Sequence, residues 1–253
     1  MVLVLDLGNT NIYLGIFENG QLIHEFRKHT DLHRSSDEYV EVFKSFFLTH
    51  NIDTTSFEGG IISSVVPSLT TTLKSAIEYL INKPCLVVGK GVKTGLSIKI
   101  DNPSELGCDL VCDCVGAVSK YPLPLIIADL GTANKILVVD SQGAFIGCTI
   151  SVGLKLGIKS LTNNAAQLMD VSLLAPKKVI GKNSQDSLNS GAIYGTVSMI
   201  EGMAKRIENE LNVECNKVIT GGNAILIKDY IDGFVYDPTL ILEGLYRIYE
   251  KNK

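Results

Sequence analysis

Two acidic turns carry the residue types best suited to chemistry in this sequence. The first, Asp6-Leu7-Gly8-Asn9-Thr10-Asn11, follows the apolar run 2–5, and the second, Asp129-Leu130-Gly131-Thr132-Ala133-Asn134, follows the apolar run 125–128. Small residues after a buried strand leave backbone N–H groups open to a phosphate. A carboxylate at the strand end can bind Mg²⁺, which prefers oxygen ligands, and the threonines add hydroxyl donors. This pattern is typical of nucleotide binding through phosphate.

A third turn supports this interpretation. Thr220-Gly221-Gly222-Asn223 ends the strand predicted over 217–220 and would let the base or sugar of a nucleotide lie against the backbone. A single Asp-x-Gly sequence is weak evidence, because Asp and Gly are common in ordinary turns. Two copies together with a Gly-Gly turn are much more specific.

The two acidic turns belong to a longer internal repeat with an offset of 123 residues, from position 6 to position 129. The pairs that fall on each other are Asn11 and Asn134, Leu14 and Leu137, Gly20 and Gly143, and Ile23 and Ile146. Each copy predicts a strand, a loop and a hairpin that turns at 18–20 or at 140–143. Two copies indicate duplicated domains, since a solenoid needs more repeats.

Helical and strand patterns alternate along the rest of the chain, which predicts an α/β fold. Helices are predicted over 36–50, 69–81, 106–120, 153–169, 187–211 and 240–251, and further strands over 60–65, 85–88 and 217–220. Ser35 or Ser36 could cap the first helix, and Glu38 lies at capping-box distance from Ser35. The length of 253 residues allows two domains, which we place at 1–118 and 119–253.

Composition argues against several classes of protein. The net charge is −4 without a basic run, so a nucleic-acid-binding surface is not indicated. The six cysteines lack zinc-site spacing and are interpreted as reduced, mostly buried thiols. No apolar run approaches the ~20 residues that span a membrane. We therefore expect a cytoplasmic protein that contacts neither nucleic acid nor membrane.

Taken in order, the motifs resemble those of the type III pantothenate kinases, in the acetate kinase–hsp70–actin superfamily. The matching segments are Asp6–Asn11, Ser63-Ser64-Val65-Val66-Pro67, Gly91-Val92-Lys93-Thr94-Gly95, the substrate segment Asp101–Asp109, Asp129–Ala133 and Thr220-Gly221-Gly222. The resemblance covers nearly the whole chain. It implies two ribonuclease H-like domains, the duplicated arrangement of the actin-like ATPase fold.

The resemblance also implies a reaction, which is the ATP-dependent phosphorylation of pantothenate to 4′-phosphopantothenate, the first step of coenzyme A biosynthesis. It implies Mg²⁺, a monovalent cation (K⁺ or NH₄⁺) and a homodimer. By position, Asp109 would be the catalytic base and Asp129 would hold the monovalent cation. The implied ATP contacts are Asp6, Leu7, Gly8, Asn9, Thr10, Asn11, Ile12, Tyr13 and Thr132, and the implied pantothenate contacts are Ile100, Gly107, Cys108, Leu110 and Ser184.

The expected role of Asp109 agrees with its chemistry. An alcohol is a poor nucleophile unless a group such as a carboxylate accepts its proton within hydrogen-bond reach. Asp109 lies near the start of the helix predicted over 106–120, so it could instead simply cap that helix.

Several residues depart from the family pattern. Leu110 stands where the family has Arg, Ile100 where it has Tyr, and Asn134 and Lys135 where it has two Thr. Ser151-Val152-Gly153 replaces an Ala-Pro-Gly turn, Ala165-Ala166 replaces Thr-Ala, and Ser184 replaces a Thr but keeps the hydroxyl. Loss of the guanidinium at 110 removes a bidentate anion contact.

These departures leave three functional hypotheses. The chain could be a divergent but active kinase, a catalytically impaired relative that binds nucleotide or pantothenate as a regulator or partner subunit, or a kinase of a less anionic alcohol. Lys135 is the new feature at the second turn. Its ammonium could replace K⁺, reach a phosphate, or point to solvent from the hairpin.

Overall fold

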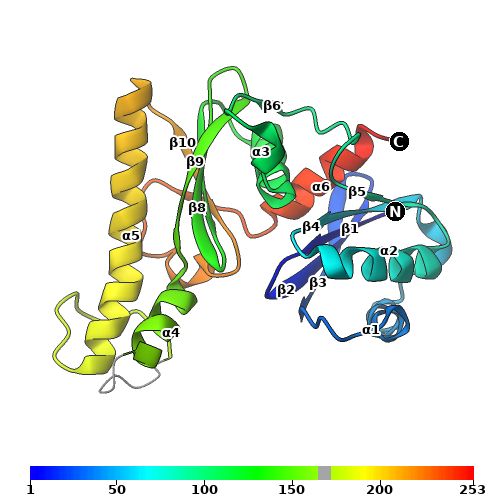
Figure 1. The fold of residues 1–253 in the computed structure, drawn as a ribbon, viewed down its shortest axis with the longest axis horizontal. Coiled ribbons are helices and arrows are strands. Elements are labelled where there is room, and N and C mark those ends of the chain that lie inside the picture. The colour runs from blue at the N-terminus through cyan, green and yellow to red at the C-terminus, as the bar shows by residue number, and fades with distance from the viewer. Residues whose placement is uncertain (165–171) are drawn as a thin grey trace. The chain divides into compact units, whose positions relative to one another are not determined.

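The computed structural model describes residues 1–164 and 172–253 (Figure 1). By contacts between Cα atoms, the chain separates into two compact units. The first contains residues 1–96, 102–119 and 240–253, and the second contains 97–101 and 120–239. The domain division expected at 118 and 119 stays a prediction. It lies close to the break after residue 119, but the segments 97–101 and 240–253 belong to the opposite units by contact.

The first unit is built on a five-stranded sheet with the order β3-β2-β1-β4-β5. Its strands are β1 (Val2–Leu7), β2 (Asn11–Glu18), β3 (Gln21–His29), β4 (Gly59–Ser64) and β5 (Cys85–Val87). The hairpin strands β1, β2 and β3 are antiparallel, whereas β4 and β5 continue parallel to β1. The apolar runs seen in the sequence therefore form the centre of the sheet, where both faces are covered.

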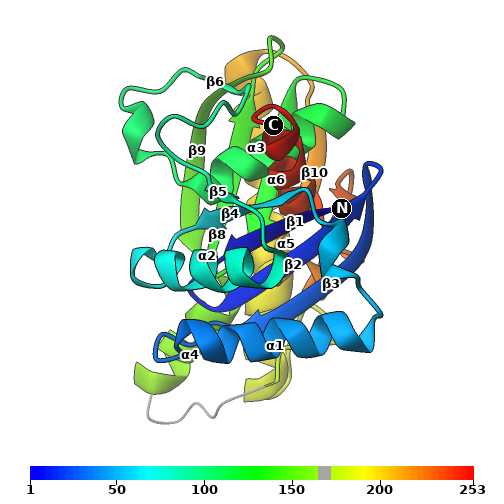
Figure 2. The same cartoon turned by 90° about the vertical axis from the view of Figure 1, so that its right-hand side faces the viewer.

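One face of this sheet is covered by α1 (Ser36–Thr49) and α2 (Pro67–Ile81), which lie side by side (Figure 2). Alternate residues of β1, among them Leu3, Leu5 and Leu7, pack with Phe43 of α1 and Leu73 of α2 in one core. A short 3-10 helix, Thr54–Ser56, lies between α1 and β4.

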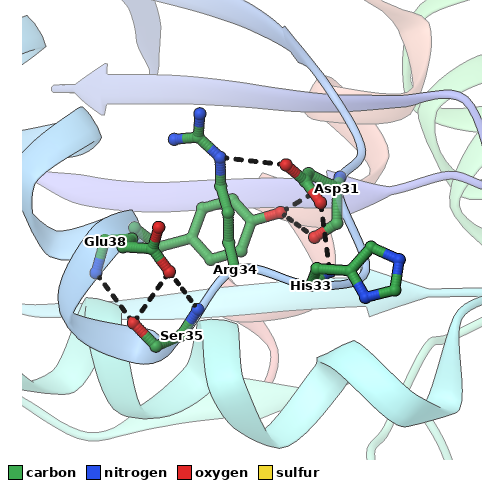
Figure 3. Close-up of polar contacts among 6 residues, drawn as sticks. Asp31, His33, Arg34, Ser35 and Glu38 are labelled. Atoms are coloured by element: carbon green, nitrogen blue, oxygen red, sulfur yellow. Dashed lines mark hydrogen bonds and ion pairs between the residues drawn. The ribbon is translucent and has the colours of Figure 1, made fainter.

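The start of α1 confirms the predicted capping box (Figure 3). The Ser35 hydroxyl accepts a hydrogen bond from the Glu38 N–H at 3.3 Å, and the Glu38 carboxylate accepts one from the Ser35 N–H at 2.8 Å. Just before the cap, Asp31 pairs with Arg34 and accepts a hydrogen bond through its backbone oxygen from the Tyr39 hydroxyl. These contacts fix where the chain leaves β3 and enters the helix.

The opposite face of the first sheet is covered by α6 (Leu240–Glu250). Leu242 of α6 lies against Gly15 of β2, and the ring of Tyr246 stacks on Phe17 with centroids 4.5 Å apart. Helix α6 also crosses α3 (Cys108–Lys120) at very short range, because a Cβ on Gly244 would lie 2.6 Å from the carbonyl carbon of Cys112. Only glycine allows this backbone contact.

The second unit contains a six-stranded sheet with the order β11-β10-β7-β8-β9-β6. Its strands are β6 (Ser97–Ile98), β7 (Leu125–Leu130), β8 (Ala133–Val139), β9 (Ala144–Val152), β10 (Asn216–Thr220) and β11 (Val235–Tyr236). The helices are α4 (Leu154–Asn164) and the long α5 (Ser184–Leu211), and short 3-10 helices occur at Pro103–Glu105 in the first unit and Ala224–Leu226 in the second. The helix predicted over 153–169 is confirmed to residue 164, and its last part, with Ala165-Ala166, lies outside the described residues.

The internal repeat is confirmed in three dimensions. The strands β3-β2-β1-β4-β5 of the first sheet correspond, in order and direction, to β9-β8-β7-β10-β11 of the second. The expected constant offset is wrong by one residue within the second strand of each copy. Four residues, 8–11, separate the paired Leu7 and Ile12, but only three, 131–133, separate the paired Leu130 and Asn134.

The shorter loop changes which residues correspond. Asn134 lies at the position of Ile12 rather than Asn11, and Leu137 at the position of Gly15 rather than Leu14. The hairpin turn of the second copy is longer, which restores the offset of 123 residues in the third strand. Four residues, 140–143, separate β8 from β9, whereas two residues, 19 and 20, separate β2 from β3. Asp6 therefore faces Tyr13 across the hairpin, whereas Asp129 faces Lys135.

Candidate functional site

The first acidic turn is a short loop fastened at its base. The Gly8 N–H donates to the Asn11 carbonyl at 3.0 Å, and the Thr30 hydroxyl donates to the Gly8 carbonyl at 2.6 Å. The Thr30 N–H also donates to the Thr10 carbonyl at 2.9 Å. Asn9, Thr10 and Asn11 remain exposed at the tip. The loop is therefore held rigidly from behind while its polar residues face solvent, as a phosphate-binding loop requires.

Tyr13 lies opposite Asp6 on the second strand of the hairpin. It is 6% exposed, its hydroxyl donates to Glu25, and the Arg27 guanidinium lies 3.6 Å from its ring centroid. Burial raises the pKa of Tyr13 well above its ordinary value, and the hydrogen bond to Glu25 acts in the same direction. The phenol is therefore a neutral donor.

The start of α3 is attached to the end of β4 by a thiol. The Cys108 S–H donates to the Ser64 carbonyl at 3.0 Å, and its sulfur accepts from the Ser64 N–H at 3.3 Å and from the Ser63 hydroxyl at 3.4 Å. Burial raises the pKa of Cys108, and the negative charges of Asp109 and Asp6 raise it further. The thiol therefore stays protonated. Its hydrogen bonds hold the start of α3, with Asp109, against the end of β4.

Asp109 lies in the first turn of α3, half-buried, and its carboxylate folds back over Gly107. A Cβ at Gly107 would collide with this carboxylate, so the glycine makes room for it. The Val111 N–H donates to the Gly107 carbonyl at 3.2 Å, which begins the helix. Leu110, the residue that replaces the family's Arg, is 7% exposed and packs into the first unit.

The second acidic turn is enclosed by its neighbours. The Asn223 N–H donates to the Leu130 carbonyl at 2.9 Å, and its side-chain amide donates to the Gly131 carbonyl at 2.8 Å. On the other side, the Gly153 N–H donates to the Thr132 carbonyl at 3.1 Å. Thr132 itself is exposed. The Gly-Gly turn and the end of β9 thus hold this loop between them.

Gly221 shows how closely these segments approach. Its φ is +92°, and a Cβ there would lie 2.5 Å from the Leu130 backbone nitrogen and would also meet the Asp129 carboxylate. Gly153 is similarly tight, since a Cβ there would lie 2.5 Å from the Gly131 carbonyl oxygen. A side chain at 221 would require both an unfavourable backbone conformation and a displaced loop.

Lys135 forms an ion pair with Asp129. Its Nζ lies 2.8 Å from Asp129 Oδ2, and the two side chains are 19% and 13% exposed. The hypothesis that Lys135 points to solvent is therefore wrong. The pair forms because the two residues lie directly opposite each other in the β7–β8 ladder, where side chains share one face of the sheet. Its neighbour Asn134 is buried and donates through its side chain to the Val152 carbonyl at 3.1 Å.

Two expected pantothenate contacts lie in the second unit. Ile100 is half-buried in the segment after β6. Ser184 is exposed as the first residue of α5, after the Asn183 cap, whose side chain accepts from the Asp186 N–H at 2.8 Å. Ser184 lines a cavity of about 550 Å³ with Gly181, Lys182 and Ser187. Gly107, Cys108 and Leu110 belong to the first unit.

Sequence reasoning missed Thr30 and the side-chain role of Asn223. Thr30, directly after β3, fastens the first loop, and Asn223, in the third turn, fastens the second loop through its side chain. Neither contact has a sequence signal of its own, because each joins segments that are distant in the sequence. Across residues 1–164 and 172–253, no three His, Cys, Asp or Glu side chains converge as a metal site. No helix in that part of the chain is long and apolar enough to cross a membrane.

Comparison with known proteins gives a consistent result. A family described as type III pantothenate kinase matches residues 2–206. A type III pantothenate kinase of Exiguobacterium sp. (strain ATCC BAA-1283 / AT1b) is 39% identical over 254 residues, which cover 100% of both chains.

Solved structures show the same fold at low identity. A Campylobacter jejuni protein described as a Baf family transcriptional activator is 20% identical, with a TM-score of 0.61 over 99% of this chain and 98% of its own. A Sinorhizobium meliloti protein described as a 2-dehydro-3-deoxygalactonokinase is 10% identical, with a TM-score of 0.62 over 99% and 96%. A component of an Acidaminococcus fermentans (R)-2-hydroxyglutaryl-CoA dehydratase has a TM-score of 0.58 at 13% identity over 100% and 99%. These likenesses confirm the α/β, actin-like ATPase fold.

Proposed function

We propose that this chain, which belongs to the type III pantothenate kinase family, transfers the terminal phosphoryl group of ATP to the hydroxyl of pantothenate. The observation that carries this conclusion is the 39% identity with a type III pantothenate kinase over the full length of both chains. The product is 4′-phosphopantothenate, and the reaction is the first step of coenzyme A biosynthesis. Within residues 1–164 and 172–253, no structural feature favours a regulator that has lost catalysis.

The geometry of the two loops supports nucleotide binding in this reaction. Phosphoryl transfer depends mainly on positioning and on neutralising charge. We assign the ATP contacts to residues 6–13 and to Thr132. The rigid base of each loop and its exposed tip are the properties that this assignment needs.

Asp109 is assigned as the general base. Its carboxylate is half-buried at the start of α3, a position fixed by the bonds between Cys108 and β4. From there it would accept the proton of the pantothenate hydroxyl as that oxygen attacks phosphorus. Gly107, Cys108, Leu110, Ile100 and Ser184 are assigned to the substrate. Because Leu110 is buried, it would act by packing rather than by a polar contact.

The donor set of the first loop fits Mg²⁺. In kinases this ion is usually held by one or two carboxylates together with the substrate phosphates, so a cluster of three acidic side chains is not needed. Asp6, at the end of β1 beside the loop, is the residue that would hold it. When bound, the ion neutralises charge on the transferred phosphoryl group.

The decisive experiment is direct phosphorylation of pantothenate by the purified protein with Mg-ATP. We expect 4′-phosphopantothenate by mass spectrometry and one ADP per product in a coupled assay. Thermal shift with ATP and with pantothenate is measured in parallel, because a ligand of the folded state raises the melting temperature. Binding without turnover would identify a catalytically impaired relative. Turnover with another small alcohol but not pantothenate would identify a different kinase.

A homodimer is also part of the proposal. Ile150 and Val152 of β9 and Leu156 and Leu161 of α4 are large apolar side chains that are all exposed. A contiguous exposed apolar surface is typical of an interface, and we propose that these side chains form such a surface and that a second copy of this chain covers it. In sedimentation equilibrium, the wild type should behave as a dimer. Ile150→Asp together with Leu156→Asp should give a folded monomer, and a wild-type monomer would contradict the proposal.

We place the protein in the cytoplasm. The six cysteines, all in the described part of the chain, form no disulfide, and Cys85, Cys112, Cys114 and Cys215 are buried, as predicted. Free thiols are typical of a reducing compartment, where disulfides are rare.

A further inference from the structure

The ion pair between Lys135 and Asp129 lies next to the second acidic turn. Asp129 is the last-but-one residue of β7, directly before the second loop, and the pair is largely buried. Most lysines on a hairpin direct the ammonium to solvent, because charged groups lose hydration when buried. A lysine that is instead held 2.8 Å from this carboxylate places one fixed positive charge beside the loop.

We propose that the Lys135 ammonium takes the place of a monovalent cation, so that this kinase works without K⁺ or NH₄⁺. The inference rests on the proposed kinase function. It concerns the position at Asp129, where the family resemblance implies such an ion. At this position the chain supplies the cation covalently, as part of β8.

The surroundings of Asp129 do not fit a second cation. One carboxylate oxygen is occupied by the ammonium, and the other lies against Gly221, where even a Cβ would collide. An added K⁺ would be repelled by the ammonium at short range and would have to share a single carboxylate with it. The residues at 134 and 135 also lack the two threonine hydroxyls expected there. Asn134 directs its side-chain amide to the Val152 carbonyl instead.

The positive charge of Lys135 would favour phosphate binding at the second loop. A carboxylate before the second loop would repel the phosphates of ATP if its charge were not balanced. The ammonium balances this charge without adding a group that must bind from solution. Because it is attached to the chain, the balance holds at any K⁺ concentration, whereas a bound ion is lost when its concentration falls below its dissociation constant.

The test compares K⁺, NH₄⁺, Na⁺ and choline chloride at equal ionic strength, so that screening is constant. Wild-type kcat/KM for pantothenate is expected to change by less than about twofold among these salts. Lys135→Met should lower kcat by about 10²-fold without K⁺, as loss of one charge-stabilising donor does. Addition of K⁺ or NH₄⁺ should restore much of this loss, and Na⁺ or choline should not.

A matched control is available in the same unit. Lys217 pairs with Glu208, and the two side chains are 18% and 11% exposed, nearly the same burial as for Lys135 and Asp129. Lys217→Met leaves a buried carboxylate without its lysine, as Lys135→Met does, and should lower stability comparably. It should not create a response to K⁺. A response specific to Lys135→Met therefore reports the cation position and not general destabilisation.

Melting temperatures in the same salts give a readout that does not need turnover. The wild type should show no stabilisation specific to K⁺, and Lys135→Met should gain one. Strong K⁺ activation of the wild type, or a K⁺-specific rise in its melting temperature, would overturn the proposal. If no salt supports pantothenate phosphorylation, the proposed function fails. The melting temperatures still decide whether Lys135 occupies the cation position.

Discussion

Asp109→Asn is expected to lower kcat for pantothenate phosphorylation by about 10²–10⁴-fold, the usual contribution of a general base. Asparagine keeps the size of the side chain and its place over Gly107 but cannot accept the hydroxyl proton. KM for ATP should change little, because the ATP contacts are assigned to other residues. The measurement is steady-state kinetics with an ADP-coupled assay, supported by the melting temperature.

Asp37→Asn is a suitable control for this experiment. Asp37 is an exposed aspartate in the first turn of α1, so the substitution removes the same charge from a helix start in the same unit. It should leave kcat unchanged. If Asp109→Asn keeps full activity, the base is another group, and Asp109 serves only to cap the start of α3.

The second large effect is expected at Gly221. Gly221→Ala should lower the free energy of unfolding of the second unit by roughly 2–6 kcal/mol, because backbone strain and overpacking each cost about 1–3 kcal/mol. The strain arises at φ +92°, and the overpacking arises against the Leu130 nitrogen and the Asp129 carboxylate. Movement of this loop should also raise KM for ATP. Urea denaturation and ATP titrations measure the two effects.

A control substitution at Gly233 separates backbone strain from overpacking. It has a φ of +74° in the same unit, but a Cβ there would meet nothing within 4 Å. Gly233→Ala should therefore cost only the backbone strain, about 1–2 kcal/mol, and leave KM for ATP unchanged. Equal losses of stability in the two variants would show that the close approach of the Gly-Gly turn to the second loop contributes nothing.

Much of the fold could be predicted because local sequence patterns determine it. The strand β7 and its hairpin partners follow from short apolar runs and turn glycines, and the start of α1 follows from Ser35 and Glu38. The strand β11 was missed, since two residues carry no periodicity and the strand forms only by pairing with β10. Similarly, nothing in the sequence around residues 240–250 shows which unit that helix joins.

The candidate site was predicted less completely. The acidic turns were identified from their residue types. The structural effect of the departures from the family pattern on these turns was not predicted. Under the expected offset of 123 residues, Lys135 would correspond to Ile12, which pairs with Leu7. The second loop is one residue shorter than the first, so Lys135 instead pairs with Asp129. Cross-strand pairing depends on loop length, and a change of one residue alters every partner in the ladder. The Lys135–Asp129 ion pair therefore became visible only in the structure.

The place of α6 in the first unit also determines when that unit can fold. Residues 1–96 leave the ribosome first, but one face of their sheet is covered by α6, which is made only after the whole second unit, 120–239, has been synthesised. Until then, Phe17 lacks its stacking partner Tyr246, and Gly15 lacks its neighbour Leu242. During synthesis this exposed sheet is a target for chaperones and for aggregation, and a premature stop before residue 240 would leave it uncovered permanently.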